Sequence, residues 1–174
     1  GCPSGDYILH LNEDLPNDLF DRLGVGASID VEQPFLLVIF HPVTTEFHSQ
    51  REQTEHLIEA LHELSFPTIW IWPNIDAGSD QISKALRVYR EYHEADWLHL
   101  IKNLDPVNFQ KTLKRAACAV GNSSSFIRDS TFSGTPVVLV GDRQLGREHG
   151  ENLISRAPNP EDILTAIRQQ LVNG

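Results

Sequence analysis

The feature that most constrains the fold is a regular alternation of short apolar runs with longer amphipathic stretches across residues 35–172. The apolar runs have the length of buried strands, and the longer stretches carry apolar residues at helical spacing. The expected strands are residues 35–40, 68–72, 97–101, 117–120 and 136–140. The expected helices are residues 49–64, 78 or 79 to 93, 106–115, 123–132 and 160–172. This alternation predicts an α/β fold with a doubly wound parallel sheet and helices on both faces.

Residues 1–34 are less regular, and we expect an irregular, partly helical lead-in to a lobe formed by residues 35–174. Residues 16–23 indicate a helix with Pro16 near its first turn and Gly24 as its stop. Residues 24–28 indicate a loop. A chain of 174 residues is long enough for one domain with a core and too short for two ordinary domains.

Composition excludes several classes of protein. Hydrophobic content of 40% and charged content of 22% fit a soluble globular chain, and a formal net charge of −10 argues against nucleic acid or an anionic membrane as partner. No apolar run approaches the roughly 18 residues that span a bilayer, and no signal peptide is visible. The two cysteines, Cys2 and Cys118, indicate neither a disulfide framework nor a metal site, so we expect a cytoplasmic location. The chain has no Met and opens on Gly1, which leaves both a removed initiator and an interior start open.

Polar side chains follow most of the expected strands, at the edge where parallel sheets bind ligands. His41 follows the first strand and can contact a phosphate, act as an acid or base, or simply close the strand end. Asn74 follows the second strand, and a glycine-punctuated polar loop at residues 141–152 follows the fifth. Residues 102–105, after the third strand, offer only backbone and capping groups.

The fourth strand leads into Gly121-Asn122-Ser123-Ser124-Ser125, which is typical of a tight turn before a helix. Free N–H groups at a helix start, together with serine hydroxyls, favour a phosphate. The alternative is that Asn122 or Ser123 only caps the helix. Asp129 lies a little over one turn further, within reach of a ribose hydroxyl pair.

The strand-end runs are, in order, His41-Pro42-Val43-Thr44-Thr45, Pro73-Asn74-Ile75-Asp76-Ala77-Gly78-Ser79, Gly121-Asn122-Ser123-Ser124-Ser125, Gly134-Thr135-Pro136-Val137-Val138 and Gly141-Asp142-Arg143-Gln144-Leu145-Gly146-Arg147-Glu148. In this order they resemble the motifs of the UDP-N-acetylglucosamine 2-epimerase family. The last run resembles the hydrolysing branch, which converts UDP-N-acetylglucosamine to N-acetylmannosamine and UDP for sialic-acid-type sugar synthesis. The resemblance covers the family's C-terminal half, from near Gly1 to about Leu153.

The resemblance implies one Rossmann-like lobe of a two-lobed GT-B enzyme, with the active site between the lobes. The partners it implies are a UDP-sugar substrate and the N-terminal lobe, which is missing from this sequence and carries most of the catalytic carboxylates. The isolated chain would therefore be inactive. The full-length enzyme would be a homo-oligomer, and no cofactor is implied.

The resemblance also implies the residues of the site: His41 as the catalytic residue in the cleft, Asn74 at the nucleotide, Ser123 and Ser124 at the phosphates, Asp129 at the ribose and Arg143 at the diphosphate. Two positions depart from the family pattern, because Asp129 stands where glutamate is usual and Phe126 where glycine is common. Phe126 would narrow the pocket or stack on the ligand, so a UDP-linked diacetamido sugar is an alternative substrate. A GT-B glycosyltransferase lobe and a non-enzymatic flavodoxin-like binding module also remain open.

Overall fold

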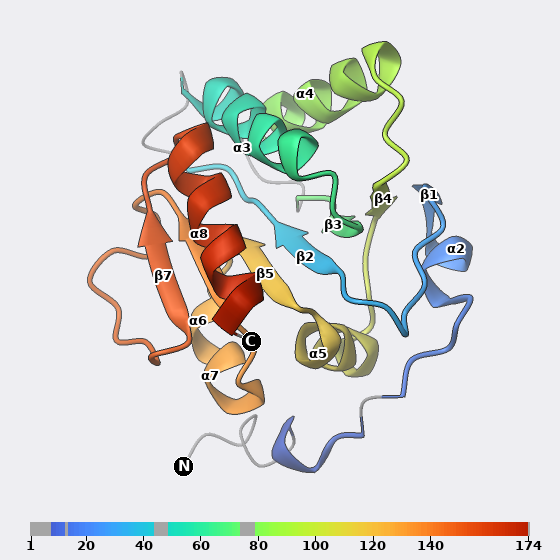
Figure 1. Cartoon of the computed structure of the whole chain (residues 1–174), viewed down its shortest axis with the longest axis vertical. Helices are drawn as coiled ribbons and strands as arrows, with labels where there is room; N and C mark the ends of the chain where they lie inside the picture. The colour runs from blue at the N-terminus through green and yellow to red at the C-terminus, as the bar shows by residue number, and fades with distance from the viewer. Residues whose placement is uncertain (1–7, 13, 44–48, 74–78, 174) are drawn as a thin grey trace.

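The computed structural model describes residues 8–12, 14–43, 49–73 and 79–173. The strands are β1 Gly24–Gly26, β2 Leu36–Ile39, β3 Thr68–Ile71, β4 Leu98–Ile101, β5 Cys118–Gly121, β6 Val137–Val140 and β7 Leu153–Arg156. The helices are α2 Leu19–Leu23, α3 Gln50–Leu64, α4 Ser79–Tyr92, α5 Pro106–Arg115, α6 Ser125–Arg128, α7 Ser130–Ser133 and α8 Pro160–Asn173. Figure 1 shows them arranged around one twisted sheet. In the described ranges, no helix is long and apolar enough to cross a membrane.

The sheet has the strand order β1-β4-β3-β2-β5-β6-β7. Strands β2 to β7 pair in parallel, and only β1 pairs antiparallel, against β4. Counted along the chain, the parallel strands have the order 3-2-1-4-5-6 of dinucleotide-binding folds, whereas a flavodoxin-like sheet has the order 2-1-3-4-5. The predicted doubly wound α/β fold is confirmed, and the flavodoxin-like alternative is wrong.

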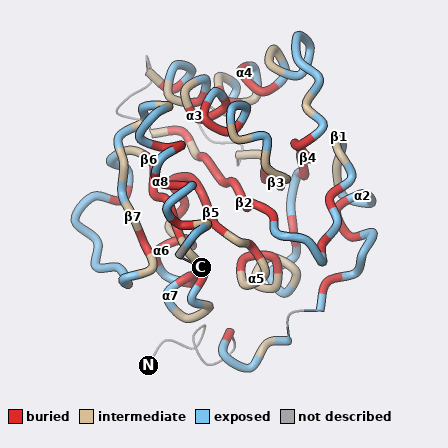
Figure 2. The backbone as a smooth tube through the Cα atoms, viewed as in Figure 1, coloured by how far each residue is buried: buried red, intermediate tan, exposed pale blue. Residues whose placement is uncertain are grey.

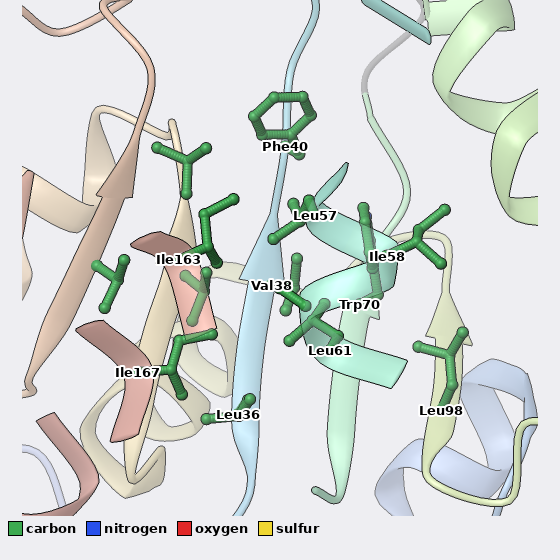
Figure 3. Packing of buried hydrophobic residues seen from close by; sticks show 14 of the residues in the cluster. Leu36, Val38, Phe40, Leu57, Ile58, Leu61, Trp70, Leu98, Ile163 and Ile167 are labelled. Atoms are coloured by element: carbon green, nitrogen blue, oxygen red, sulfur yellow. The ribbon is translucent and has the colours of Figure 1, made fainter. Parts of the chain in front are cut away.

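Helices cover both faces of the sheet because successive side chains of each buried strand point to opposite sides. Leu36, Val38 and Phe40 pack into one core cluster with α3, α4 and α8 (Figure 3). Leu37 and Ile39 pack into a second cluster with α2, α5 and α6. The central strands are accordingly buried along their length (Figure 2).

The lead-in belongs to this core. Leu19 and Phe20 of α2 are buried in the second cluster, and β1 extends the sheet beside β4. The loop expected at residues 24–28 is therefore wrong for Gly24–Gly26. A glycine is required there, because a Cβ on Gly26, at φ +131°, would lie 2.2 Å from the Leu98 carbonyl oxygen.

The helix expected at residues 123–132 is instead divided into α6 and α7 at Asp129. The hydroxyls of Ser130 and Thr131 donate to the carbonyl oxygens of Phe126 and Ile127 one turn earlier, and such bonds bend helices. The Phe126 ring is fully buried in the second core cluster and does not line the pocket described below. The expectation that Phe126 narrows the pocket or stacks on a ligand is wrong.

The predicted start of α5 is confirmed. The Asp105 side chain accepts hydrogen bonds from the N–H groups of Val107 and Asn108, and Pro106 occupies the first turn. These bonds, those from Asn108 above all, hold the pKa of Asp105 below its ordinary value. Helix α5 therefore begins directly after the short segment that follows β4.

Candidate functional site

The strand order reverses between β2 and β5, and open α/β sheets bind ligands beyond the carboxyl ends of the strands at this switch point. β2 ends before His41 and β5 ends at Gly121. Gly121 has φ +140°, and a Cβ there would lie 1.9 Å from the Ile39 carbonyl oxygen, so only glycine fits this close approach. The turn that follows is thereby held against the end of β2.

Asn122 joins the two strand ends. Its side-chain Oδ1 accepts a hydrogen bond of 2.7 Å from the His41 N–H, and its Nδ2 donates one of 2.8 Å to the His41 carbonyl oxygen. Asn122 is 1% exposed. The helix-capping alternative for Asn122 is therefore wrong, because its amide serves the neighbouring strand.

A pocket of about 200 Å³ opens at this edge. It collects residues that follow four parallel strands and one residue from the second turn of α5. Its lining residues are Ile39, His41, Ile71, Trp72, Asn103, Leu104, Phe109, Ser123 and Ser125. The lining combines an apolar wall with hydroxyl, imidazole and amide groups, which is the composition of a pocket for an amphipathic small molecule.

His41 and Ser123 of the predicted site lie together in this pocket. The Ser123 hydroxyl accepts a hydrogen bond of 3.3 Å from the Ser125 N–H, which shapes the turn. Ser124 directly precedes α6, is half-buried, and makes no side-chain capping bond to that helix. The pocket is thus lined by Ser123 and Ser125, and Ser124 stands between them in the chain.

Asp129 follows α6, and its carboxylate is hydrogen-bonded to other side chains of the same chain. Its carboxylate, whose side chain is 3% exposed, accepts hydrogen bonds from Arg128 Nε at 2.8 Å and from Gln110 Nε2 at 3.0 Å. Arg143 is exposed, and its Nη1 donates to the Asn122 carbonyl oxygen at 3.4 Å. Asn74 lies outside the described residues.

Several functional candidates were missed from the sequence. Leu104 and Phe109 line the pocket although the loop after the third strand carried little polar signal. The position of this loop at a carboxyl strand end was the available indication. Gln144 is 6% exposed and donates through Nε2 to the Asn122 carbonyl oxygen at 3.0 Å. Over the described ranges, no three His, Cys, Asp or Glu side chains are grouped so that they could hold a metal ion.

Fold and pocket together define a Rossmann-like lobe of the GT-B architecture, with its pocket at the switch point of the sheet. The chain belongs to the UDP-N-acetylglucosamine 2-epimerase family, whose sequence profile matches residues 3–173. Membership in this family sets aside an unrelated GT-B glycosyltransferase as the origin of the lobe.

Curated relatives carry related names. The chain is 29% identical to the UDP-N,N'-diacetylbacillosamine 2-epimerase (hydrolyzing) of Legionella pneumophila over 98% of this chain and 44% of that protein. It is 34% identical to the UDP-N-acetylglucosamine 2-epimerase of Neisseria meningitidis over 75% of this chain and 34% of that protein. The chain thus spans less than half the length of these relatives.

Solved structures share the fold. The UDP-GlcNAc 2-epimerase of Methanocaldococcus jannaschii, solved in complex with UDP-GlcNAc and UDP, matches with a TM-score of 0.65 at 14% identity. The match covers 97% of this chain and 46% of that one.

Proposed function

We propose that this chain is the UDP-sugar-binding C-terminal lobe of a hydrolysing UDP-N-acetylglucosamine 2-epimerase. The full-length enzyme would convert UDP-N-acetylglucosamine to N-acetylmannosamine and UDP for sialic-acid-type sugar synthesis. The observation that carries the proposal is the meeting of His41 and Ser123 in one pocket at the switch point of the sheet. The loop run Arg143-Gln144-Leu145-Gly146-Arg147-Glu148 supports the hydrolysing branch.

The diphosphate would lie at the turn after β5. Helix α6 has only 4 residues, so its dipole adds little, and the binding groups are the hydroxyls and N–H groups of Ser123 and Ser124. His41 faces the same pocket and would contact the sugar-diphosphate end of the ligand. Arg143 would supply a positive charge from the loop after β6.

The nucleoside would occupy the apolar part of the pocket, beside Leu104 and Phe109. Asp129 would bind the ribose, which requires its carboxylate to exchange a hydrogen bond with Arg128 or Gln110 for one with the sugar hydroxyls. Asn74, which follows β3 in the sequence and lies outside the described residues, would contact the nucleotide.

A titration of the isotope-labelled chain with UDP tests the binding role. We expect the NMR signals of residues 123–129 and of His41 to shift at millimolar UDP. Unshifted signals in this range at millimolar UDP would count heavily against the proposal. Gln170, a buried amide at the opposite edge of the sheet, serves as the internal reference, because its signals are expected to stay in place.

The reaction itself requires the full-length enzyme, because we propose that the N-terminal lobe supplies the catalytic carboxylates and that the complete protein is a homo-oligomer. We expect the isolated chain to bind UDP without turnover. With UDP-N-acetylglucosamine, the full-length protein is expected to release free N-acetylmannosamine and UDP. Retention of the epimerised sugar on UDP would assign the protein to the non-hydrolysing branch.

A UDP-linked diacetamido sugar is a second candidate substrate. It is favoured by the name of the Legionella pneumophila relative, which covers 98% of this chain. A competition between UDP-N-acetylglucosamine and a UDP-diacetamido sugar on the full-length enzyme decides between them, through the ratio of their kcat/KM values.

A further inference from the structure

Asn122 connects three separate chain segments at the switch point. Besides the two side-chain bonds to the His41 backbone, its N–H donates to the Ile39 carbonyl oxygen at 3.1 Å. Its own carbonyl oxygen accepts hydrogen bonds from Gln144 Nε2 at 3.0 Å and from Arg143 Nη1 at 3.4 Å. One residue therefore ties the end of β2, the turn after β5 and the loop after β6 to one another.

The side-chain bonds continue the sheet past its last backbone pair. Backbone pairing between β2 and β5 extends to Ile39 and Gly121. One residue further, the Asn122 amide replaces a strand by accepting from the N–H and donating to the carbonyl of His41. The two bonds fix the backbone of His41, and with it the direction in which the imidazole leaves the strand.

Gln144, in the loop after β6, holds the backbone of Asn122. It is 6% exposed although its neighbours in the loop, Arg143 and Leu145, are exposed. Its Nε2 is bonded to Asn122, whereas its buried Oε1 has no hydrogen-bond partner among the residues that the structure describes. A buried unpaired amide oxygen is unfavourable compared with an apolar side chain of similar size. Fold stability alone does not explain an amide at this position.

We infer that Asn122 and Gln144 are positioning residues for the diphosphate end of the ligand. Asn122 fixes the backbone of His41 through its two side-chain hydrogen bonds. Gln144 holds the loop after β6 in place, so that Arg143 contacts the turn after β5. Ser123 then lies between groups whose separation is fixed before the ligand arrives, which favours binding because less ordering remains to be done. The inference rests on the proposed UDP-sugar function and assigns which residues make the site rigid.

The chain offers a matched control at the opposite edge of the sheet. Gln170 is also 6% exposed, and its Nε2 donates to the carbonyl oxygens of Val137 and Asn152 at 2.8 and 2.9 Å. Gln144→Leu and Gln170→Leu therefore remove amides of equal burial, although Gln170 makes two hydrogen bonds through Nε2 and Gln144 makes one. Only the first lies beside the pocket.

The test compares UDP with uridine, which lacks the phosphates, in NMR titrations of the complete chain. In Gln144→Leu we expect the ratio of UDP affinity to uridine affinity to fall about tenfold, which corresponds to the loss of one hydrogen bond to the charged diphosphate. In Gln170→Leu we expect the melting temperature to fall and the ratio to stay as in the wild type. Asn122→Asp, which keeps the acceptor and loses the donor, is expected to lower the ratio as well.

The outcomes separate the inference from the proposed function. A wild-type chain that does not bind UDP overturns the proposed function and the inference with it. A wild-type chain that binds UDP, with an unchanged ratio in Gln144→Leu, overturns the inference alone. If Gln144→Leu does not fold, Gln144→Met is titrated in its place, because the flexible thioether adapts to the same volume. Failure of both variants to fold shows that the amide supports stability and overturns the positioning role.

Discussion

Two places in the sheet, here called corners, each combine a close-approach glycine with a buried polar residue, but the two pairs have different roles. At the corner between β2 and β5, Gly121 lets two backbones approach closely, and the buried Asn122 side chain binds the backbone of a distant segment. At the corner between β1 and β4, Gly26 allows the same close approach. There the buried His99 places its Nδ1 2.6 Å from the Ala27 carbonyl oxygen and its Nε2 2.8 Å from that of Phe20.

The corners differ in the direction of their strands. β2 and β5 are parallel and end at the same edge, so the residues that follow them, His41 and Ser123, meet in a pocket. β1 and β4 are antiparallel, and both ring nitrogens of His99 are directed at the lead-in. In this molecule, the glycine and buried polar residue lie beside the pocket where parallel strands end together, and they bind the lead-in where the strands are antiparallel.

The largest effect is expected from Gly121→Ala. The backbone there has φ +140°, and the new Cβ would meet the Ile39 carbonyl oxygen at 1.9 Å, so the centre of the sheet must open. We expect a loss of about 3 kcal/mol or more of unfolding free energy, measured by chemical denaturation.

Gly26→Ala is the matched variant at the other corner. Its backbone is also unfavourable for alanine, with φ +131° and a Cβ contact of 2.2 Å to the Leu98 carbonyl oxygen. Because β1 is an edge strand of 3 residues, it can move away, and we expect a loss of only about 1–2 kcal/mol. Equal losses in the two variants would contradict the distinction between the corners.

The central part of the fold could be predicted because β2 to β6 are buried on both faces and read as continuous apolar runs. β1 could not be predicted, since two glycines in a strand of 3 residues carry no hydrophobic pattern. β7 was missed because Ser155 is exposed and Ile154 only half-buried. The division of the helix at Asp129 was not predicted, because the bonds from Ser130 and Thr131 to the backbone leave the helical periodicity of the sequence unchanged.

The site was predictable in its polar part. His41 and Ser123 follow strands whose carboxyl ends must share an edge, so their meeting follows from the α/β pattern. Leu104 and Phe109 could not be assigned, because apolar residues near a sheet resemble core residues. The pairing of Gln110 with Asp129 connects residues 19 positions apart and depends on how α5 packs beside α7.

His99→Leu is expected to lower the unfolding free energy less than Gly121→Ala does. The substitution leaves the carbonyl oxygens of Phe20 and Ala27 without the ring nitrogens that face them, in a buried place. We expect a loss of about 2–3 kcal/mol in denaturation and an unchanged affinity for UDP. His56→Leu removes a single contact, of 2.8 Å to the Pro158 carbonyl oxygen, and is expected to cost about 1 kcal/mol. Weaker UDP binding in His99→Leu would show that the two corners are coupled.

A third effect concerns the carboxylate beside the site. Arg128→Ala removes the ion pair to Asp129, whose side chain is 3% exposed. Within the described part of the chain, the bond from Gln110 is then the one side-chain bond left to this carboxylate. We expect a loss of about 1–2 kcal/mol, measured by denaturation. Arg51→Ala breaks an exposed pair with Glu55 at 2.6 Å and is expected to cost less than about 0.5 kcal/mol. A loss in Arg128→Ala no larger than that in Arg51→Ala would show that the buried carboxylate is satisfied by other groups.

The smallest expected effect concerns the reactivity of the Cys118 thiol, at the start of β5. Burial raises the pKa of its thiol from 9.0 to about 12, so the reactive thiolate is suppressed in the folded protein. The contribution to stability is therefore complete below the ordinary pKa of 9.0 and is lost as the pH rises toward 12. In a Cys2→Ser chain at about pH 8, we expect a thiol reagent to label Cys118 only after denaturant is added.

The rate at which Cys118 is labelled also allows a direct comparison of the two corners. In the Cys2→Ser background, Gly121→Ala is expected to accelerate labelling of Cys118 without denaturant, because the added methyl separates β5 from β2. Gly26→Ala disturbs an edge that Cys118 does not contact in the sheet order, so its labelling is expected to stay at the rate of the parent chain. Equal acceleration in both variants would mean that the sheet opens as one unit and that the site corner has no local stability of its own.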